Sequence, residues 1–355
     1  MNPFSLPVLV SASRRIFFAI GGVLFAAFLA AGYVVFYGGN DFGGEDQKEF
    51  FVRRGASFAQ IVDSLEQAGI IRNHWMFKLV GRVYGGTDRM QVGRYRFTNG
   101  ASNTEIFLTL RDGKGNELIR VTIPEGSRSR LQARIFSRAI GIDSARYMNL
   151  VNDPAVAREF GIEAASLEGY LLPETYSLHW GIDEKELVEL QMREFKTFFT
   201  DSLMQRAQEL GWNVHQVMTF ASIVEGEAIL DGERPVIAGV YRNRLRIGMR
   251  LEADPTIQYL FGDRPRRVLY SDLRIENPYN TYMYAGLPPG PVNNPGKASV
   301  LASLYPAEHT YLFFVANGRR GHWFASTYDE HVRNVRRYRH ERARQWREAK
   351  GPTGG

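Results

Sequence analysis

The first pattern along the chain is a long apolar run, from residue 16 to residue 37, that contains no charged residue. A helix needs about 20 such residues to cross a bilayer core, so the run predicts a transmembrane helix. Arg14 and Arg15 precede the run and acidic residues follow it between positions 41 and 46, which places the N-terminus in the cytoplasm. A cleaved signal peptide is the alternative, although its apolar region is usually shorter, about 7–15 residues.

Three local units then repeat one pattern, in which a strand and a glycine turn lead through a capping serine into a helix. The units begin at residues 51–57, 95–102 and 119–127. The first unit, together with a strand near residues 93–97, resembles a LysM-like sugar-binding module. The alternative is that such units are common in proteins and that this region binds no glycan.

The pattern further along predicts a helix that begins after Asn213 as its N-cap. Apolar residues recur at the spacing of one buried face, at Val214, Val217, Met218, Ala221, Ala228 and Ile229. Glu225 falls on this apolar face, whereas Glu227 lies roughly 160° around the helix on a polar arc.

A carboxylate on a buried face must be paired, neutralised or exposed in a cleft, because burying a lone charge is costly. No Lys or Arg lies within one turn of Glu225, so burial would favour its protonated form, which can donate a proton. The alternative is a structural glutamate that bonds to a distant arginine or backbone group.

The remaining pattern predicts four more elements. Asp183 and Glu186 form a candidate capping box for a helix that reaches Leu210. Pro235 starts another helix that ends near Leu245. Residues 311–315 and 322–325 predict a β-hairpin, and a basic helix runs from about residue 328 to residue 350.

Composition and charge argue against several classes of function. A chain of 355 residues suits roughly two domains. The net charge of +6 is concentrated in residues 331–350, which leaves the rest nearly neutral and argues against a nucleic-acid partner. The chain has no cysteine, which excludes disulfides and thiol chemistry. Its seven histidines are scattered without metal-ligand spacing, so no metal site and no cofactor are expected.

Four short stretches place tyrosines and other aromatic residues among amides and carboxylates: residues 167–176, 252–259, 279–291 and 322–324. Aromatic faces that stack on sugar rings, with amides and carboxylates that bond hydroxyl groups, are typical of a saccharide groove. Each stretch also has a local explanation, because Pro173 and Pro255 can end elements and residues 287–291 can form a stiff linker.

Five motifs in these regions together resemble the MltG (YceG-like) family of membrane-anchored endolytic peptidoglycan transglycosylases. They lie at residues 167–176, 221–225, 254–256, 280–282 and 286–291, and the resemblance covers residues 48–340. The family's catalytic glutamate falls on Glu225. Gly226, Glu227 and Ala228 follow it, where many relatives carry a Lys-Glu-Thr-like run.

The fold implied by the resemblance is α+β: one N-terminal transmembrane helix, a small LysM-like α/β subdomain and a mixed α+β catalytic domain. We expect a cytoplasmic N-terminus at 1–15, a transmembrane helix at 16–37, a tether at 38–47 and the LysM-like subdomain at 48–120. A connecting region at 121–163, a catalytic domain at 164–345 and a tail at 346–355 complete the expected order.

The implied reaction cleaves the β-1,4 bond between N-acetylmuramic acid and N-acetylglucosamine in nascent peptidoglycan, leaves 1,6-anhydro-muramyl ends and terminates strand elongation. One carboxyl group suffices, because the sugar's own C6 hydroxyl is the nucleophile. The implied location is the inner membrane with the catalytic domain outside the cytoplasm. The implied partners are peptidoglycan strands, the membrane and peptidoglycan synthases (penicillin-binding proteins).

The sequence also predicts substrate contacts around Glu225: Glu168, Glu174, Tyr176, Asp254, Gln258, Asn280 and Tyr282. Two other functions stay open. One is a hydrolase of the same bond, with water activated by Glu225 or by a second acid such as Asp254. The other is a wall-binding scaffold without catalytic activity.

Overall fold

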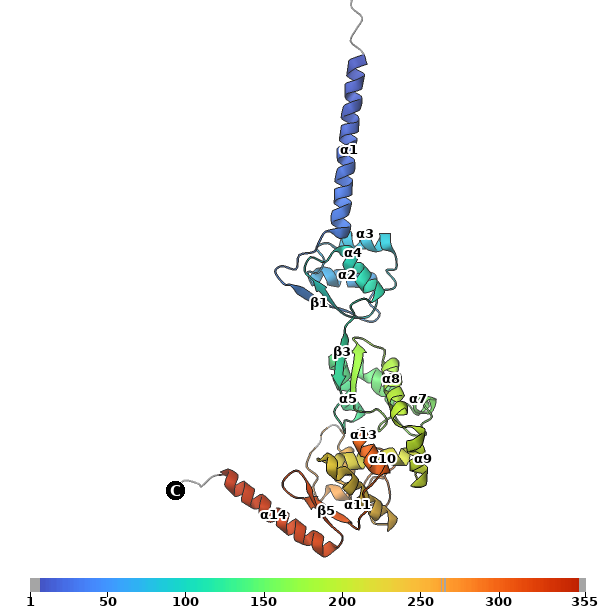
Figure 1. Cartoon of the computed structure of the whole chain (residues 1–355), viewed down its shortest axis with the longest axis vertical. Coiled ribbons are helices and arrows are strands. Elements are labelled where there is room, and N and C mark those ends of the chain that lie inside the picture. The colour runs from blue at the N-terminus through green and yellow to red at the C-terminus, as the bar shows by residue number, and fades with distance from the viewer. Residues whose placement is uncertain (1–6, 263, 265, 351–355) are drawn as a thin grey trace, which may run out of the picture. The chain divides into compact units, whose positions relative to one another are not determined.

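The computed structural model describes residues 7–262, 264 and 266–350, so residues 1–6 of the predicted cytoplasmic segment and 351–355 of the predicted tail lie outside the described residues. The chain divides into two compact units (Figure 1). The first comprises Met1–Ile119 and Leu178–Ile182, and the second comprises Arg120–Ser177 and Asp183–Gly355. The second unit contains the predicted connecting range 121–163 and, apart from residues 178–182, the predicted catalytic range 164–345.

The N-terminal element is helix α1, Pro7–Tyr37. Its apolar stretch Phe17–Tyr37 is long and apolar enough to cross a membrane, and none of the apolar window is buried inside the protein. A helix that is apolar on all sides and uncovered has no stable place in water, so this one is compatible with a single-pass membrane anchor.

The first unit is built on one antiparallel strand pair with helices packed against it. Its elements are β1 (Gln47–Val52), α2 (Phe58–Gln67), α3 (His74–Tyr84), β2 (Gly93–Thr98) and α4 (Asn103–Asp112). Phe50 lies opposite Tyr95 in the register of the pair, and both are buried in the core. Ser57 and Ser102 cap α2 and α4 through their side chains, as the repeated pattern predicts.

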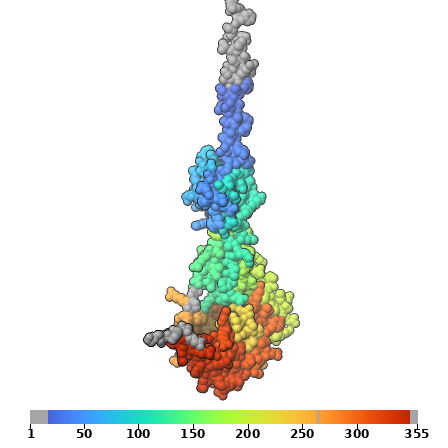
Figure 2. Space-filling model, turned by 60° about the vertical axis from the view of Figure 1, so that its left-hand side comes forward, coloured from blue at the N-terminus to red at the C-terminus, as the bar shows by residue number. Residues whose placement is uncertain are grey.

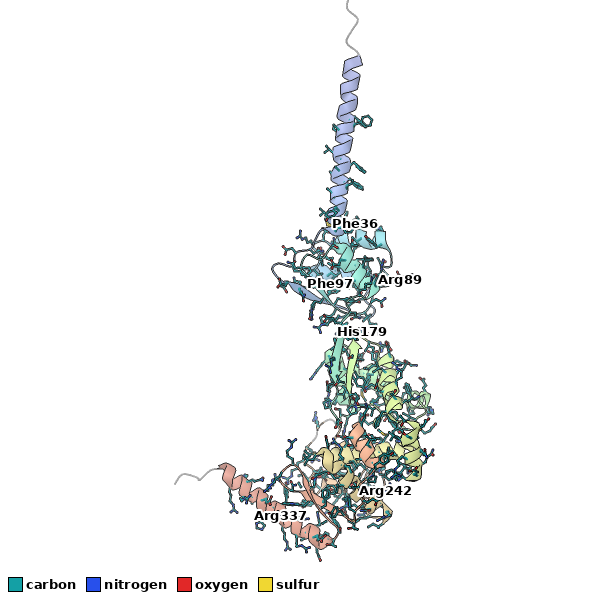
Figure 3. All side chains as sticks on the ribbon, in the orientation of Figure 1. Phe36, Arg89, Phe97, His179, Arg242 and Arg337 are labelled. Atoms are coloured by element: carbon teal, nitrogen blue, oxygen red, sulfur yellow. The ribbon has the colours of Figure 1, made fainter. Side chains whose placement is uncertain are left out.

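The end of α1 and the segment after it are bound to this first unit. Val35 and Phe36 pack against its core, with Phe36 labelled in Figure 3, and the Asn103 side chain donates a hydrogen bond to the Val35 carbonyl. Asn40 and Phe42 are buried, and the Asn40 amide donates to the Ala101 carbonyl. The segment that the sequence suggests as a free tether is therefore held in place at these residues.

The second unit is mostly helical and carries short strand pairs. β5 (Phe313–Ala316) pairs with β6 (His322–Ala325). β3 (Leu118–Thr122) pairs with β4 (Thr175–His179), and Arg120–Thr122 and Thr175–Ser177 of these two strands belong to this unit. Its helices are α5 (Ser129–Ile140), α6 (Ser144–Val151), α7 (Pro154–Glu159), α8 (Glu184–Phe198), α9 (Asp201–Glu209), α10 (Val214–Glu227), α11 (Arg234–Arg246), α12 (Asp254–Leu260), α13 (Lys297–Leu304) and α14 (Tyr328–Lys350), with short 3₁₀ turns at Asp231–Glu233 and Asp272–Arg274. This is a mixed α+β unit, and its segments from distant parts of the chain lie against one another at its surface (Figure 2).

Helix α10 lies at the centre of the second unit, packed against α11, α12 and α13 (Figure 1). Its predicted start is confirmed, because Asn213 and Gln216 form a reciprocal capping box. The prediction of a single apolar face is wrong, since every residue from Val217 to Val224 is buried. A helix enclosed on all sides loses the distinction between an apolar face and a polar arc.

Other sequence predictions met mixed outcomes. The hairpin at residues 313–325 and the basic helix α14 are confirmed. The helix predicted from Asp183 to Leu210 is two helices, because the chain leaves helical geometry at Phe199 before α9 starts. Asp183 caps α8 by accepting a hydrogen bond from the Lys185 N–H, without a capping box. Ser127 does not cap α5; its hydroxyl donates to the Pro124 carbonyl.

Candidate functional site

Glu225 is in the last turn of α10, and its carboxylate lies at the start of α13. One oxygen, Oε2, accepts hydrogen bonds from the Gly296 N–H at 3.0 Å and from the Ser299 hydroxyl at 2.7 Å. Gly296 is the N-cap of α13, so the carboxylate occupies the position where backbone N–H groups lack partners and negative charge is favourable. The Glu225 side chain is 6% exposed.

Arg234, the first residue of α11, compensates this buried charge. Its Nη2 lies 3.4 Å from Glu225 Oε1 and its Nε donates to Ser299 Oγ at 2.9 Å. The Arg234 side chain is itself 6% exposed. No Lys or Arg lies within one turn of Glu225, as the sequence shows, and its cationic partner instead comes nine residues later, across the turn between two helices. The same contacts also fit the structural alternative, so geometry at Glu225 alone does not decide its role.

A second carboxylate, which sequence reasoning missed, shares the same guanidinium. Glu125 Oε2 lies 3.0 Å from Arg234 Nη2, and burial together with the negative charge of Glu225 raises the pKa of Glu125. Glu125 belongs to the turn after β3, where Gly126 has a φ of 69°. A side chain on Gly296 would overlap the Glu125 carboxylate, so both glycines allow the close approach.

The turn that carries Glu125 is fixed by the side chain of Asn294. The Asn294 amide donates to the Ser127 carbonyl at 2.9 Å and to Glu168 Oε1 at 2.8 Å. Its oxygen accepts hydrogen bonds from the Gly169 N–H at 2.7 Å and the Leu171 N–H at 3.1 Å. One amide thereby joins three loops that are distant in the sequence and holds them next to Gly296.

Glu168 completes this arrangement by capping α5 from outside that helix. Its carboxylate oxygens lie 3.1 and 3.2 Å from the backbone nitrogen of Ser129 and accept the hydrogen bond of its N–H. This N–H is at the start of α5, where it has no acceptor within the helix and where Arg128 provides no side-chain cap. Burial raises the pKa of Glu168 to about 7. The contacts of Glu168 make it a positioning residue for the Glu125 turn.

A cavity of about 640 Å³ lies next to these residues, within the second unit. This volume is within the range of small-molecule sites, about 300–1,000 Å³. Its wall includes Gly126 and Gly226, which flank Glu225: a Cβ on Gly126 would lie 3.5 Å from Glu225 Cγ. Six polar or charged residues also line the cavity, namely Arg128, Arg134, Glu227, Asp254, Gln258 and Asn293.

The helix pattern predicts that Glu227 lies on a polar face, and this prediction is wrong. Its carboxylate accepts a hydrogen bond from the Tyr241 hydroxyl at 2.8 Å, and burial raises the pKa of Glu227 to about 7. Asp254, which is exposed, accepts a hydrogen bond from the Tyr282 hydroxyl at 2.7 Å. Two of the predicted substrate contacts, Asp254 and Gln258, thus line the cavity, and a third, Tyr282, holds Asp254.

The other predicted contacts are placed differently. Glu174 forms an ion pair of 2.6 Å with Lys297 at the start of α13. Tyr176 is buried and its hydroxyl donates to the Leu172 carbonyl. Asn280 is fully buried and its amide donates to the Leu273 and Ile275 carbonyls. These hydrogen bonds favour structural roles for Tyr176 and Asn280.

The motif stretches nevertheless meet around α10. Thr256 and Thr281 bond through their hydroxyls at 2.9 Å, which joins the second stretch to the third. His322 in the hairpin pairs with Glu233 at 2.7 Å, one residue before Arg234. Among the residues that the structure describes, no group of three His, Cys, Asp or Glu side chains could hold a metal ion.

Comparison with known proteins gives the family. The family model of the YceG-like family matches residues 50–337, which is most of the chain. The chain belongs to the YceG-like family. A solved YceG-like structure, a crystal structure from Listeria monocytogenes, has a similar fold with a TM-score of 0.58 at 28% identity, over 81% of this chain and 98% of that chain.

Two curated relatives of this YceG-like chain carry the name endolytic murein transglycosylase. The Bacillus subtilis (strain 168) protein is 29% identical over 298 residues, which cover 80% of this chain and 82% of the relative. The Streptococcus pneumoniae serotype 2 (strain D39) protein is 26% identical over 318 residues, which cover 80% of this chain and 57% of that relative. The resemblance stated from the motifs is therefore confirmed.

The raised pKa of Glu168 in this YceG-like chain predicts a pH-dependent stability. The folded protein binds this proton up to about pH 7, whereas the unfolded chain releases it near the ordinary value of about 4.3. The stabilisation is therefore fully present below that ordinary value and is lost as pH rises through 7. We expect the thermal midpoint of the wild type to fall more between pH 5 and pH 8 than that of Glu168→Gln, which has no proton to lose.

Differential scanning calorimetry at several pH values measures this difference. Glu186→Gln, on the exposed side of α8, is the matched control and should follow the wild type. Parallel curves for Glu168→Gln and the wild type would show that Glu168 is ionised in the folded protein at all these pH values.

Proposed function

We propose that this chain is a membrane-anchored endolytic lytic transglycosylase of peptidoglycan with Glu225 as its catalytic acid and base. Membership of the family and the names of its relatives support the reaction class. The observation that carries the assignment to Glu225 is its position: a carboxylate fixed by the N-terminus of α13 and by Arg234, beside a cavity of about 640 Å³.

In the proposed reaction, the protonated Glu225 donates its proton to the glycosidic oxygen between N-acetylmuramic acid and N-acetylglucosamine as the C1–O bond breaks. The resulting carboxylate takes the proton of the muramyl C6 hydroxyl while O6 bonds to C1. The product is a 1,6-anhydro end, no water is consumed and Glu225 regains its proton. The tethered hydroxyl has the effective-concentration advantage of an intramolecular reactant.

Arg234 and Ser299 suit both forms of such a residue. As a carboxylate, Glu225 is stabilised by the guanidinium and two hydrogen-bond donors. As an acid, it needs an acceptor, and the Ser299 hydroxyl can rotate to accept because serine is both donor and acceptor. Glu125 offers the guanidinium of Arg234 a second carboxylate partner during this change.

A hydrolase of the same bond is the second candidate function. The observation that favours it is that Glu227 and Asp254 both line the cavity, because most glycosidases pair an acid with a second carboxylate. A wall-binding scaffold is a further alternative, and any turnover of purified strands by the protein argues against it. The resemblance also predicts that β1, α2, α3 and β2 form a LysM-like module that binds glycan; the two strands of this region pair antiparallel. It further predicts that peptidoglycan synthases are partners. Both stay predictions that rest on resemblance.

Glu225→Gln is expected to lower the rate of anhydro-end formation by about 10²–10⁴-fold, because glutamine can neither donate nor accept the proton. Glu227→Gln is expected to stay within about tenfold of the wild type. Glutamine imitates the neutral form of Glu227, whose pKa is raised to about 7, and it can still accept the hydrogen bond of Tyr241.

The measurement is the initial rate of strand cleavage by full-length protein in detergent, normalised to the folded fraction from circular dichroism. The reverse order, with Glu227→Gln inactive and Glu225→Gln active, would move the catalytic role to Glu227. Equal activity of both variants and the wild type would exclude either glutamate as the catalyst.

We also propose that α1 anchors the chain in the inner membrane with the N-terminus in the cytoplasm and everything after residue 38 outside it. Arg14 and Arg15 before the apolar stretch support this orientation. A reporter that is active only in the cytoplasm, fused after residue 355, should therefore be silent, and the same reporter fused before residue 1 should be active. Activity of the C-terminal fusion would contradict the orientation.

A further inference from the structure

Two residues that line the cavity beside Glu225 each carry a buried amide oxygen without a partner in the described part of the chain. Among the described residues, neither Asn293 Oδ1 nor Gln258 Oε1 has a hydrogen-bond partner, and both residues line the cavity. Asn293 is only 7% exposed. A buried acceptor without a partner is unfavourable, so two lining residues that each carry such an oxygen indicate that the cavity receives donors from a ligand.

The orientation of both amides is fixed by their other ends. The Asn293 Nδ2 donates to the Ser222 carbonyl at 2.9 Å, and a flipped amide would place oxygen against oxygen there. The Ser222 hydroxyl cannot replace this contact, because it donates to the Thr219 carbonyl and accepts from the Val292 N–H. The Gln258 Nε2 is likewise bound to the Arg266 carbonyl. The amide nitrogen of each side chain is therefore bonded, and its oxygen is left as the acceptor without a partner among the residues that the structure describes.

We propose that Asn293 Oδ1 and Gln258 Oε1 are the hydrogen-bond acceptors of a saccharide subsite that binds a neutral N-acetylated sugar unit. The two acceptors come from different elements, Gln258 from α12 and Asn293 from the loop before α13. Acetamido N–H and hydroxyl groups are neutral donors that suit amide oxygens. This inference rests on the proposed function for the identity of the ligand, and Asn293 was not among the substrate contacts expected from the sequence.

The placement of Asn293 explains how this subsite would serve the reaction. Its Nδ2 would lie 3.7 Å from a Cβ on Gly226, the residue that follows Glu225, and Ser222 is on α10 one turn before Glu225. A sugar bound by Asn293 would therefore be positioned relative to the helix that carries the catalytic carboxylate. Asn293 and Gln258 are positioning residues for the substrate.

Paired substitutions separate a substrate contact from a structural one. Asn293→Leu removes the acceptor and the donor to Ser222, whereas Asn293→Asp removes only the donor and keeps an acceptor oxygen. The probe is an N-acetylglucosamine hexasaccharide, which has no peptide, and binding is measured by titration calorimetry with full-length protein in detergent. All variants carry Glu225→Gln, which prevents turnover.

We expect Asn293→Leu to weaken the dissociation constant about tenfold, the size of one lost hydrogen bond, and Asn293→Asp to stay within about threefold of its parent. Equal weakening by both variants would show that only the bond to Ser222 matters and would overturn the inference. Absence of hexasaccharide binding by the parent, or unchanged binding by Asn293→Leu, would overturn it as well.

A second pair guards against misfolding of the Asn293 variants. Gln258→Met should weaken binding about tenfold, and Gln258→Glu, which keeps the acceptor, should restore most of it. Gln208→Met, on the exposed side of α9, is the matched control and should bind like its parent. The proposed function is judged separately, by whether wild-type protein forms anhydro ends; failure there leaves the binding result standing, and failure of binding leaves the catalytic assignment standing.

Discussion

The buried guanidinium of Arg234 is the charge on which the candidate site depends. A cation that is 6% exposed is stable only with anionic partners and a full set of hydrogen bonds. Glu225, Glu125 and Asp231 supply the negative charge and Ser299 supplies an acceptor. Asp231 is close to Arg234 in the chain, whereas Glu225, Glu125 and Ser299 come from α10, the turn after β3 and α13, so their contacts with one guanidinium bring these three segments together. Catalysis by Glu225, as proposed, would use an interaction that folding already demands.

The amide of Asn294 also brings distant segments together, through hydrogen bonds and without a charge of its own. It satisfies backbone groups of two loops and a carboxylate oxygen of Glu168, which in turn caps α5. Buried backbone groups need such partners, and one side chain that bonds several loops fixes their mutual positions. The neighbouring residue, Asn293, differs in one respect: its oxygen has no partner among the described residues. A structural amide and a proposed substrate contact thus occupy successive positions of one loop.

The sequence predicted local structure well and long-range partners poorly, for a physical reason. The start of α10 at Asn213 and the hairpin of β5 and β6 depend on residues close in the chain, and both are confirmed. Arg234 and Glu125 escaped notice because their contacts with Glu225 depend on tertiary packing, which periodicity does not encode. The polar position predicted for Glu227 was wrong for the same reason, since α10 is enclosed on all sides. The signal that could have found Glu125 is the strand–turn pattern at residues 119–127, which places a carboxylate beside Gly126.

In the proposed reaction the sugar's own hydroxyl, and not water, attacks the anomeric carbon. Digestion of purified peptidoglycan strands in water enriched in ¹⁸O, followed by mass spectrometry of the new ends, distinguishes the two nucleophiles. Attack by the C6 hydroxyl gives muramyl ends that contain no ¹⁸O and are one water lighter than a reducing end. Ends that carry one ¹⁸O atom would show that water is the nucleophile and that the enzyme is a hydrolase.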